Sequence, residues 1–453
     1  MNSLCLATNY LLMTPANRQM WIDFDRHLED FGARLTLLSS TASDEPLPFP
    51  IISIPFLLRD YATSFPGACR NGYISAADWE LLRVDSFRSN NAYPPGEGIA
   101  GLFACRKFLS SILETLQPGY VLTWDPTSPM AQILQALARE AGLPVQGLER
   151  GLLPETLMIE SRGIQGYSDL RTHWLAQDIP ASASKPEKFE RIRDYYLSTK
   201  PQKYAQPEFG QGGAALRESL GLKGKKVIVF LGHYDACGLV PKNSNQRRYN
   251  SPVYDSTADA LTAVGDILAQ DASVAVVFKP HPIDSVPYVL ANVQGIRVVR
   301  DVNVHALIDL ADVVVAQFTT LQFEAALYEK PVVLLARSAW WGRNAAYEVN
   351  SKAELIPALQ AALARKNWPI HSANARSFLA WTMEHFHIGR TATVPARRDL
   401  RDFAKFVATT SLDSRHLPPA TERWEQVEHA LNQLRQPAHK TFGQNAPFEL
   451  AFA

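Results

Sequence analysis

The amino-acid sequence predicts an α/β protein made of two doubly wound domains. Three observations support this prediction. Short apolar segments alternate with longer amphipathic segments in both halves of the chain, a polar stretch separates the two series, and 453 residues are enough for two or three hydrophobic cores. Alternating strand and helix patterns are typical of parallel sheets covered by helices.

The first series covers residues 1–180, which we predict to form the N-terminal domain. Its strand-like segments are short and rich in β-branched or other apolar residues, whereas its helix-like segments have apolar residues at helical spacing. The predicted strands are Leu4–Ala7, Leu35–Leu38, Tyr120–Trp124 and Val145–Leu148, and the predicted helices are Asn17–Phe31, Gly98–Leu116 and Pro129–Ala141.

Residues 181–213 are rich in Lys, Pro, Gln, Gly and Ser, and we expect a linker there. The second series, over residues 214–395, predicts another doubly wound domain. Its expected strands are Val227–Leu231, Val274–Phe278, Ile296–Val299, Val313–Ala316 and Val332–Leu335. Its expected helices are Thr257–Ala269, Val304–Leu310, Leu321–Tyr328 and Lys352–Ala364.

Residues 396–453 are expected to hold C-terminal helices, Asp399–Ala408 and Ala420–Leu434, and a tail. The charged run Arg397-Arg398-Asp399-Leu400-Arg401-Asp402 is typical of a solvated helix start, and contact with a membrane surface is the alternative.

The composition narrows the class of function. Lys and Arg equal Asp and Glu in number, which gives a net charge of zero and argues against a nucleic-acid-binding protein. The four cysteines are far apart and form no zinc spacing, so we expect reduced thiols. The sequence has no apolar run of membrane-spanning length, and its first residues resemble a strand more than a signal peptide. A cytoplasmic protein is expected.

Lys279-Pro280-His281-Pro282 directly follows an apolar strand. The two prolines restrict the backbone to a stiff, extended path, so Lys279 and His281 are expected to project from the strand end. Ligands of open α/β sheets bind beyond the carboxyl ends of strands. The segment is therefore either a ligand site or an ordinary strand exit.

Thr319 and Thr320 follow a second strand of the same predicted sheet and precede a helix that contains Glu324. Hydroxyl groups and free amides at a helix start favour an anion. Glu324 is one residue too far along for a capping box with Thr320, which leaves it available to bind ribose hydroxyls. Plain helix capping with a surface glutamate is the alternative.

Two further strand exits carry charged side chains. Asp235 follows the strand Val227–Leu231, where a carboxylate can trap an oxocarbenium-like carbon or can simply form a turn. Glu149 and Arg150 follow the strand Val145–Leu148 in the other domain, where they either face a cleft or form a surface pair.

Known phosphate and metal motifs do not occur in the sequence. It contains neither a GxGxxG fingerprint after its first strand nor a GxxxxGK[ST] loop, and it has no HExxH motif or cluster of His and Cys. We therefore expect no metal and no bound cofactor.

Taken together, these residues resemble the capsule polysaccharide synthesis family, which includes the bacterial retaining β-Kdo transferases. The resemblance covers roughly residues 118–345. Its motifs are Glu149-Arg150-Gly151 with Pro154, Glu160, Gly163, Gly166 and Ser168, then Lys279-Pro280-His281-Pro282, then Thr319-Thr320 with Glu324-Ala325, and finally Lys330-Pro331-Val332-Val333. Leu152 and Leu153 depart from the aromatic and arginine residues often found after the signature glycine.

The resemblance implies a GT-B fold, with two Rossmann-like domains facing each other across a cleft. It implies transfer of Kdo from CMP-β-Kdo, with retained configuration, onto a capsule, O-antigen or lipopolysaccharide acceptor. Asp235 would be the nucleophile, and Glu149 would activate or position the acceptor. Lys279, His281, Thr319, Thr320, Glu324 and Arg150 would hold the donor, and His281 would assist catalysis.

The implied partners are a nucleotide-sugar donor and a glycan or glycolipid acceptor, with peripheral contact to polysaccharide assembly machinery at the inner-membrane face. Two alternatives stay open. One is a GT-B transferase that uses a UDP-sugar or CDP-glycerol, and the other is a non-catalytic scaffold that binds nucleotide or glycan.

Overall fold

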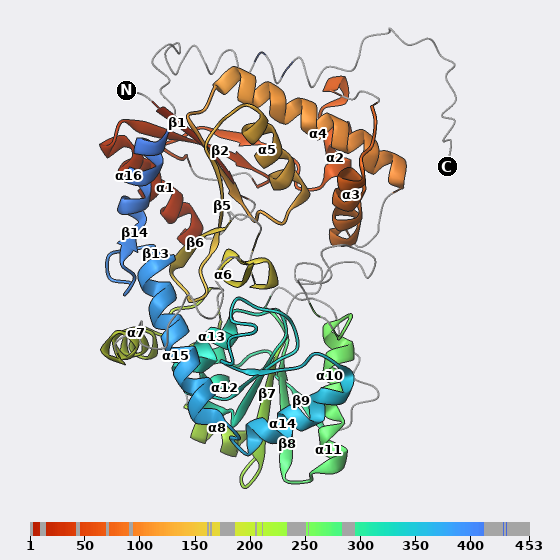
Figure 1. Ribbon diagram of the computed structural model, residues 1–453, viewed down its shortest axis with the longest axis vertical. Coiled ribbons are helices and arrows are strands. Elements are labelled where there is room, and N and C mark those ends of the chain that lie inside the picture. Colours follow the sequence, from red (N-terminus) through yellow and green to blue (C-terminus); the bar gives the residue numbers. More distant parts are fainter. Residues whose placement is uncertain are drawn as a thin grey trace.

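The computed structural model confirms an α/β fold with two doubly wound domains (Figure 1). It describes residues 3–9, 15–41, 46–68, 72–89, 94–160, 163, 165–172, 186–203, 206–210, 212–232, 251, 253–282, 295–411, 429 and 432. The N-terminal domain contains one sheet of eight strands, and the C-terminal domain contains one sheet of six strands.

The N-terminal sheet has the order β14-β13-β6-β5-β4-β1-β2-β3. Its first five strands in the sequence are parallel, whereas β6 pairs antiparallel with both β5 and β13. The strands are β1 (Ser3–Asn9), β2 (Ala33–Ser39), β3 (Ile51–Ser53), β4 (Tyr120–Trp124), β5 (Val145–Arg150), β6 (Thr156–Glu160), β13 (His387–Gly389) and β14 (Arg398–Asp399).

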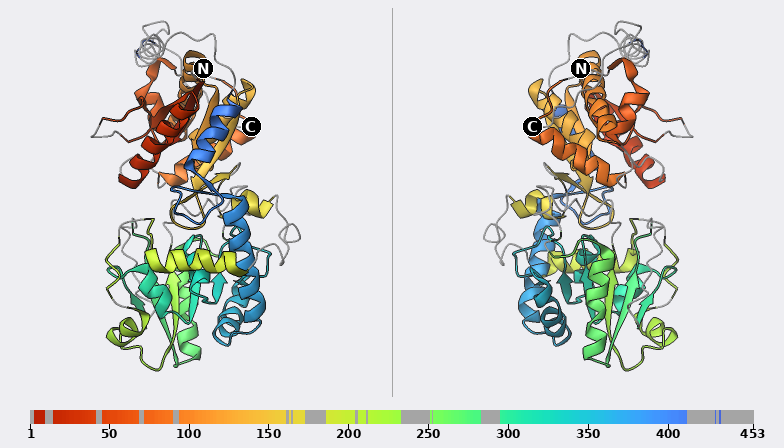
Figure 2. Two further views of the ribbon diagram at one scale, coloured as in Figure 1. Left: turned by 90° about the vertical axis from the view of Figure 1, so that its left-hand side faces the viewer. Right: turned by 90° about the vertical axis from the view of Figure 1, so that its right-hand side faces the viewer.

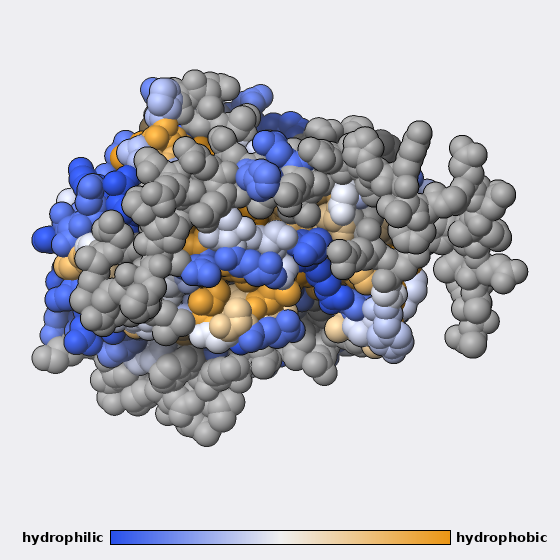
Figure 3. Space-filling view, turned by 90° about the horizontal axis from the view of Figure 1, so that it is seen from above, coloured by the Kyte–Doolittle hydropathy of each residue, from blue (hydrophilic) through white to orange (hydrophobic). Residues whose placement is uncertain are grey.

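Helices cover this sheet and bury their apolar sides against it. The longest, α4, places Leu102, Phe108, Leu109 and Ile112 in the core. Viewed from this end of the molecule, the described surface shows hydrophobic residues between bands of hydrophilic ones (Figure 3). The helices are α1 (Pro15–Asp30), α2 (Leu58–Ser64), η1 (Pro66–Ala68), α3 (Ala76–Arg88), α4 (Pro95–Leu116), α5 (Pro129–Glu140) and α16 (Leu400–Thr410). The short helices η2 (Gln165–Tyr167) and α6 (Asp169–Thr172) follow β6 and pack with the C-terminal domain instead.

The C-terminal sheet is parallel and has the order β12-β11-β10-β7-β8-β9. Apart from Lys226 and Lys279 at strand ends, the residues of its central strands β7, β8 and β10 are apolar and buried, as expected for strands covered on both faces. The strands are β7 (Lys226–Leu231), β8 (Val274–Lys279), β9 (Ile296–Val298), β10 (Val313–Ala316), β11 (Val332–Leu334) and β12 (Tyr347–Glu348).

The helices around the C-terminal sheet include one inside the segment that we expected to be a linker. This helix, α7 (Pro186–Thr199), buries Phe189, Ile192 and Tyr196 in the C-terminal core, so this part of the expected linker is helical and packed. The others are α8 (Gly213–Ser219), α10 (Thr257–Gly265), α11 (Ile267–Gln270), α12 (Val304–Leu310), α13 (Leu321–Leu327), η5 (Lys352–Glu354), α14 (Leu355–Leu363) and α15 (Trp368–His385).

After α15 the chain returns to the N-terminal domain (Figures 1 and 2). β13 extends the N-terminal sheet, and α16 packs on α1, where the rings of Phe24 and Phe403 stack 5.4 Å apart. The boundary expected at residue 395 is corrected accordingly, since residues 387–389 already belong to the N-terminal sheet. The second expected C-terminal helix, Ala420–Leu434, lies outside the described residues except for residues 429 and 432.

None of the described helices combines the length and the apolar character needed to cross a lipid bilayer.

Candidate functional site

The two domains meet where β5 ends. The turn that follows β5 carries Leu152 and Leu153, both fully buried, and their side chains join the hydrophobic core of the C-terminal domain. Gly151 precedes them and has no room for a side chain, because a Cβ atom there would lie 1.7 Å from the Thr156 hydroxyl oxygen. The turn is therefore a packed junction between the domains.

Lys203 joins the domains at this junction. Its Nζ atom donates one hydrogen bond to the carbonyl oxygen of Gly151 and another to Oγ1 of Thr320, each 2.8 Å long. Gly151 belongs to the N-terminal domain, and Thr320 immediately precedes α13 in the C-terminal domain. Burial lowers the pKa of Lys203 to about 8, and the nearby carboxyl of Glu324 opposes that shift.

Glu149 is the buried carboxyl on the N-terminal side of this junction. Its side chain is 8% exposed, and its Oε1 accepts a hydrogen bond of 2.8 Å from the backbone N–H of Arg150. Burial, together with the neighbouring charge of Asp125, raises the pKa of Glu149 to about 7. Arg150 and Lys203 act against this increase. A carboxyl with this pKa can accept a proton near neutral pH.

Glu324 is the buried carboxyl on the C-terminal side, at 3% exposed. Burial raises its pKa to about 7, and Lys203 acts against this shift. Its Oε2 atom lies 3.9 Å from Nε2 of His305, and the other ring nitrogen of His305 lies 3.1 Å from the Tyr328 hydroxyl. Glu149, Lys203 and Glu324 therefore form one electrostatic group, which we call the junction cluster.

The two threonines before α13 have different roles. Oγ1 of Thr319 accepts a hydrogen bond of 3.3 Å from the N–H of Leu321, so this hydroxyl stabilises the turn that precedes α13. Thr320 instead directs its hydroxyl to Lys203. Of the predicted donor residues, Arg150, Thr320 and Glu324 thus come together around Lys203.

Lys279 lies elsewhere on the same sheet edge, because β7 separates β8 from β10. The Lys279 side chain is 6% exposed, and its Nζ donates hydrogen bonds of 2.8 Å to the carbonyl oxygens of Arg300 and Val302. Burial lowers the pKa of this lysine. Lys279 thus holds the segment after β9 next to the end of β8 through these two hydrogen bonds. His281 is half-buried two residues later.

Asp235, the predicted nucleophile, lies outside the described residues. Its role stays a prediction.

The acidic residue of the predicted signature, Glu160, organises the chain beyond β6. It is fully buried, and its carboxylate accepts hydrogen bonds from the Ser168 hydroxyl at 2.5 Å and from the Asp169 N–H at 2.7 Å. Gly163 has a φ of 137°, which side chains disfavour, and a Cβ atom there would lie 2.2 Å from Thr127. Glu160, Ser168 and Gly163 therefore shape the segment that reaches the C-terminal domain.

Sequence reasoning identified residues 124–129 as a strand exit whose Thr127 and Ser128 cap the next helix, but it missed Lys203 and the part that Arg88 plays at the end of β4. There, Arg88 donates hydrogen bonds to Asp125 at 2.9 Å and to the Thr127 hydroxyl at 2.7 Å. Asp125 has a φ of 50° and is close enough to Glu149 to influence its pKa. The polar strand exit at residues 124–129 marked Asp125 and Thr127 in the sequence, whereas nothing in the sequence around Arg88 indicated that it would contact them.

Within the described residues, no group of three or more His, Cys, Asp and Glu side chains is arranged to hold a metal ion.

No protein-family model and no curated protein matches this chain. The solved structures with a similar shape include the β-Kdo 2,7 transferase of KpsC from Thermosulfurimonas dismutans, with 14% identity, a TM-score of 0.36, and coverage of 74% of this chain and 96% of that one. Another is the UDP-GlcNAc 2-epimerase of Methanocaldococcus jannaschii in complex with UDP-GlcNAc and UDP, with 12% identity, a TM-score of 0.39, and coverage of 84% and 99%. A glycosyltransferase from Rickettsia africae has 10% identity, a TM-score of 0.38, and coverage of 95% and 99%. At these identities and TM-scores the similarities assign no activity, and the α/β fold stands on the two sheets described above.

Proposed function

We propose that this protein is a glycosyltransferase that moves a sugar from a nucleotide-sugar donor to a glycan or glycolipid acceptor. The observation that carries this proposal is the junction cluster. Two buried carboxyls with pKa values near neutral, one from each domain, lie on either side of a lysine that contacts both domains. Acidic side chains with shifted pKa values that lie near the C-terminal ends of parallel strands are typical of catalytic sites.

Glu149 is the proposed base for the acceptor. Its burial keeps its pKa close to the working pH, so it can take the hydroxyl proton as the new glycosidic bond forms. Arg150 and Lys203 are the proposed anion ligands. An ammonium group has three donors, and Lys203 uses two of them on Gly151 and Thr320.

CMP-β-Kdo is the proposed donor, on the strength of the sequence motifs. Its sugar carries a carboxylate and its nucleotide one phosphate, and both are anions that Arg150, Lys203 and His281 are suited to bind. A single phosphate needs no metal bridge between phosphates, so the proposal includes no metal.

The proposed reaction retains the configuration through two displacements. In the first, a carboxylate oxygen of Asp235 bonds to the anomeric carbon, the bond from that carbon to the phosphate oxygen breaks, and CMP leaves with the electron pair. In the second, the acceptor oxygen displaces Asp235 while Glu149 takes the acceptor proton. We also propose peripheral contact with polysaccharide assembly machinery, where glycolipid acceptors are made.

The direct test incubates the protein with CMP-Kdo, generated in situ, and a panel of synthetic acceptors, and detects the product by mass spectrometry. We expect Glu149→Gln to abolish transfer and to leave CMP binding intact. Glu348→Gln is the matched control, because burial also raises the pKa of Glu348 to about 7 although it lies outside the junction cluster. Equal turnover by the two variants would remove Glu149 from the mechanism.

The donor is tested separately by the melting temperature of the protein with CMP, UDP and CDP. Stabilisation by CMP alone supports the Kdo donor, whereas a larger effect of UDP or CDP would point to a UDP-sugar or CDP-glycerol. If none of the three nucleotides raises the melting temperature, a non-catalytic scaffold becomes the better account.

A further inference from the structure

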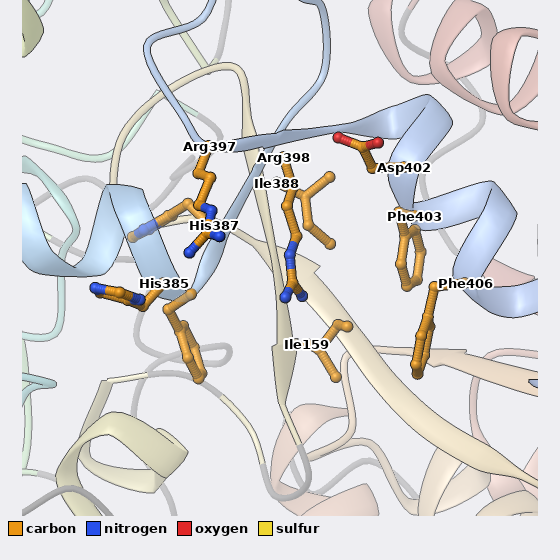
Figure 4. A pocket seen from close by; sticks show the side chains of 10 residues that line it. Ile159, His385, His387, Ile388, Arg397, Arg398, Asp402, Phe403 and Phe406 are labelled. Atoms are coloured by element: carbon orange, nitrogen blue, oxygen red, sulfur yellow. The ribbon is translucent and has the colours of Figure 1, made fainter.

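A cavity that contains none of the junction-cluster residues lies at the edge of the N-terminal sheet. It has a volume of about 480 Å³, within the range of about 300–1,000 Å³ that is usual for small-ligand sites. Its walls come from β6, β13, β14, α16 and the end of α15 (Figure 4). The lining residues are Ile159, His385, Phe386, His387, Ile388, Arg397, Arg398, Asp402, Phe403 and Phe406.

One part of this cavity is apolar. Ile159, Ile388 and the rings of Phe386, Phe403 and Phe406 form its walls. Phe406 is 41% exposed, although it is a large hydrophobic residue on a helix whose other apolar side chains are buried. An apolar ring left open beside a cavity is a surface that an apolar ligand group can cover.

The other part is cationic. Arg397 and Arg398 both line the cavity, and Figure 4 shows the Arg398 side chain pointing toward Ile159. Within the described part of the chain, neither guanidinium group has a hydrogen bond or a close ion pair, although Arg397 lies near enough to Glu384 to help lower the pKa of that carboxyl. The one acidic side chain in the wall, Asp402, already accepts a hydrogen bond from the N–H of Asp399 at the start of α16.

Two arginines whose guanidinium groups make no hydrogen bond within the described residues, beside an apolar wall, fit one class of ligand. Guanidinium groups bind phosphates and carboxylates through paired hydrogen bonds, and aromatic rings cover alkyl chains. We propose that this cavity binds an anionic amphiphile, a molecule with a phosphate or carboxylate head and an apolar chain. The proposal does not depend on the function proposed for the junction cluster.

The cavity is connected to the junction through His387. This side chain lines the cavity and is itself buried, and its Nε2 accepts a hydrogen bond of 2.9 Å from the N–H of Leu152. A ligand in the cavity would thus lie one residue away from the turn that holds Gly151 and Lys203.

The experiment uses the full chain and calorimetric titration with three probes: octyl phosphate, inorganic phosphate and octanol. We expect octyl phosphate to bind at least ten times more tightly than either of the other two, because only it fills both parts of the cavity. Binding of inorganic phosphate as tight as that of octyl phosphate would overturn the apolar half of the proposal, and absence of octyl phosphate binding would overturn all of it.

The variants Arg397→Gln and Arg398→Gln test the cationic half. Both side chains are exposed, so the fold is expected to survive, and circular dichroism checks this. Each is expected to weaken octyl phosphate binding at least tenfold. Lys405→Gln is the matched control, because this exposed lysine lies on α16 but does not line the cavity. Equal weakening by the control would show general charge attraction and refute the site.

Vesicles distinguish the two sources of such a ligand. Sedimentation with phosphatidylglycerol vesicles but not with phosphatidylcholine vesicles, lost in Arg398→Gln, assigns the cavity to a lipid at a membrane surface. Octyl phosphate binding without sedimentation assigns it to a soluble amphiphile.

Discussion

Replacement of Lys203 by methionine should destabilise the protein, and more so at pH 8 than at pH 6. Methionine keeps most of the apolar stem but removes the ammonium that holds Gly151 and Thr320. Hydrogen bonds from a charged donor contribute about 1.5–3 kcal/mol each, and better burial of the apolar side chain offsets part of the loss of two. We expect a net loss of about 3 kcal/mol at pH 6, which lowers the melting temperature by about 6–12 °C if one domain of about 150–250 residues unfolds as a unit, and by about 3 °C if the whole chain does.

The pH dependence follows from the two carboxyls. Lys203 lowers the pKa of both Glu149 and Glu324, so its removal raises both above their present value of about 7. In the variant, the folded state then keeps protons that the unfolded state has released. Its free energy of unfolding should therefore fall by up to about 1.4 kcal/mol per pH unit for each carboxyl between pH 7 and 8.

The wild-type protein loses less stability in this way above pH 7. Its carboxyls, with pKa values of about 7, release most of their remaining protons by pH 8, and the lowered pKa of Lys203, about 8, makes stability rise as pH increases beyond that value. The difference between variant and wild type should thus widen from pH 6 to pH 8.

The assay is the fluorescence-detected melting temperature of wild type and variant at pH 6, 7 and 8. Lys352→Met is the control, since Lys352 is exposed and outside the cluster. A difference that is constant across this pH range would refute the electrostatic coupling. A decrease in melting temperature no larger than that of the control would show that the hydrogen bonds of Lys203 to Gly151 and Thr320 do not stabilise the protein.

Three further predictions concern individual residues. The melting temperature of the wild type should fall as pH rises from 4.5 to 7, because burial raises the pKa of Glu324 to about 7 and the folded state therefore keeps a proton that the unfolded state releases. Glu324→Gln should make this fall smaller, and an unchanged slope would contradict the prediction. Gly151→Ala should cost about 1–3 kcal/mol of stability through the clash with Thr156, whereas Gly96→Ala, where a Cβ atom meets nothing within 4 Å, should cost none; equal melting temperatures would count against the packed turn. His281→Ala should weaken CMP binding about tenfold in calorimetry, and an unchanged affinity would exclude His281 from the donor site.

The strands of both sheets were predictable because most are continuous apolar runs. β4 and β10 have the expected limits, and β7 and β8 each extend one residue further. β3, β6 and β12 were not predicted, and neither were the short strands β13 and β14. With three and two residues they carry no recognisable pattern, and β13 pairs with β6 across more than 200 residues of sequence. The long helix α15 was missed because polar and apolar residues are mixed around it.

The candidate site was only partly predictable for a related reason. Glu149 lies at the carboxyl end of β5, Thr320 and Glu324 follow β10, and parallel strands place such residues at known edges. Lys203 follows no strand, and its two partners lie 52 and 117 residues away in the sequence. The segment around it is polar and has no period, so nothing local distinguishes this lysine from a solvated one.

The geometry of the junction cluster depends on apolar packing as well as on charge. Leu152 and Leu153 follow Gly151 directly and are buried in the C-terminal core, and burial of each leucine contributes about 1.5–3 kcal/mol. Separation of the domains at this turn would expose both leucines and would also break the contacts of Lys203. The distance between Glu149 and Glu324 is therefore set mainly by the packed turn, and Lys203 determines how readily the two carboxyls ionise at that distance. Because packing sets the distance and Lys203 sets the ionisation, the Lys203 variant should change the pH dependence of stability, whereas Gly151→Ala should lower stability at every pH.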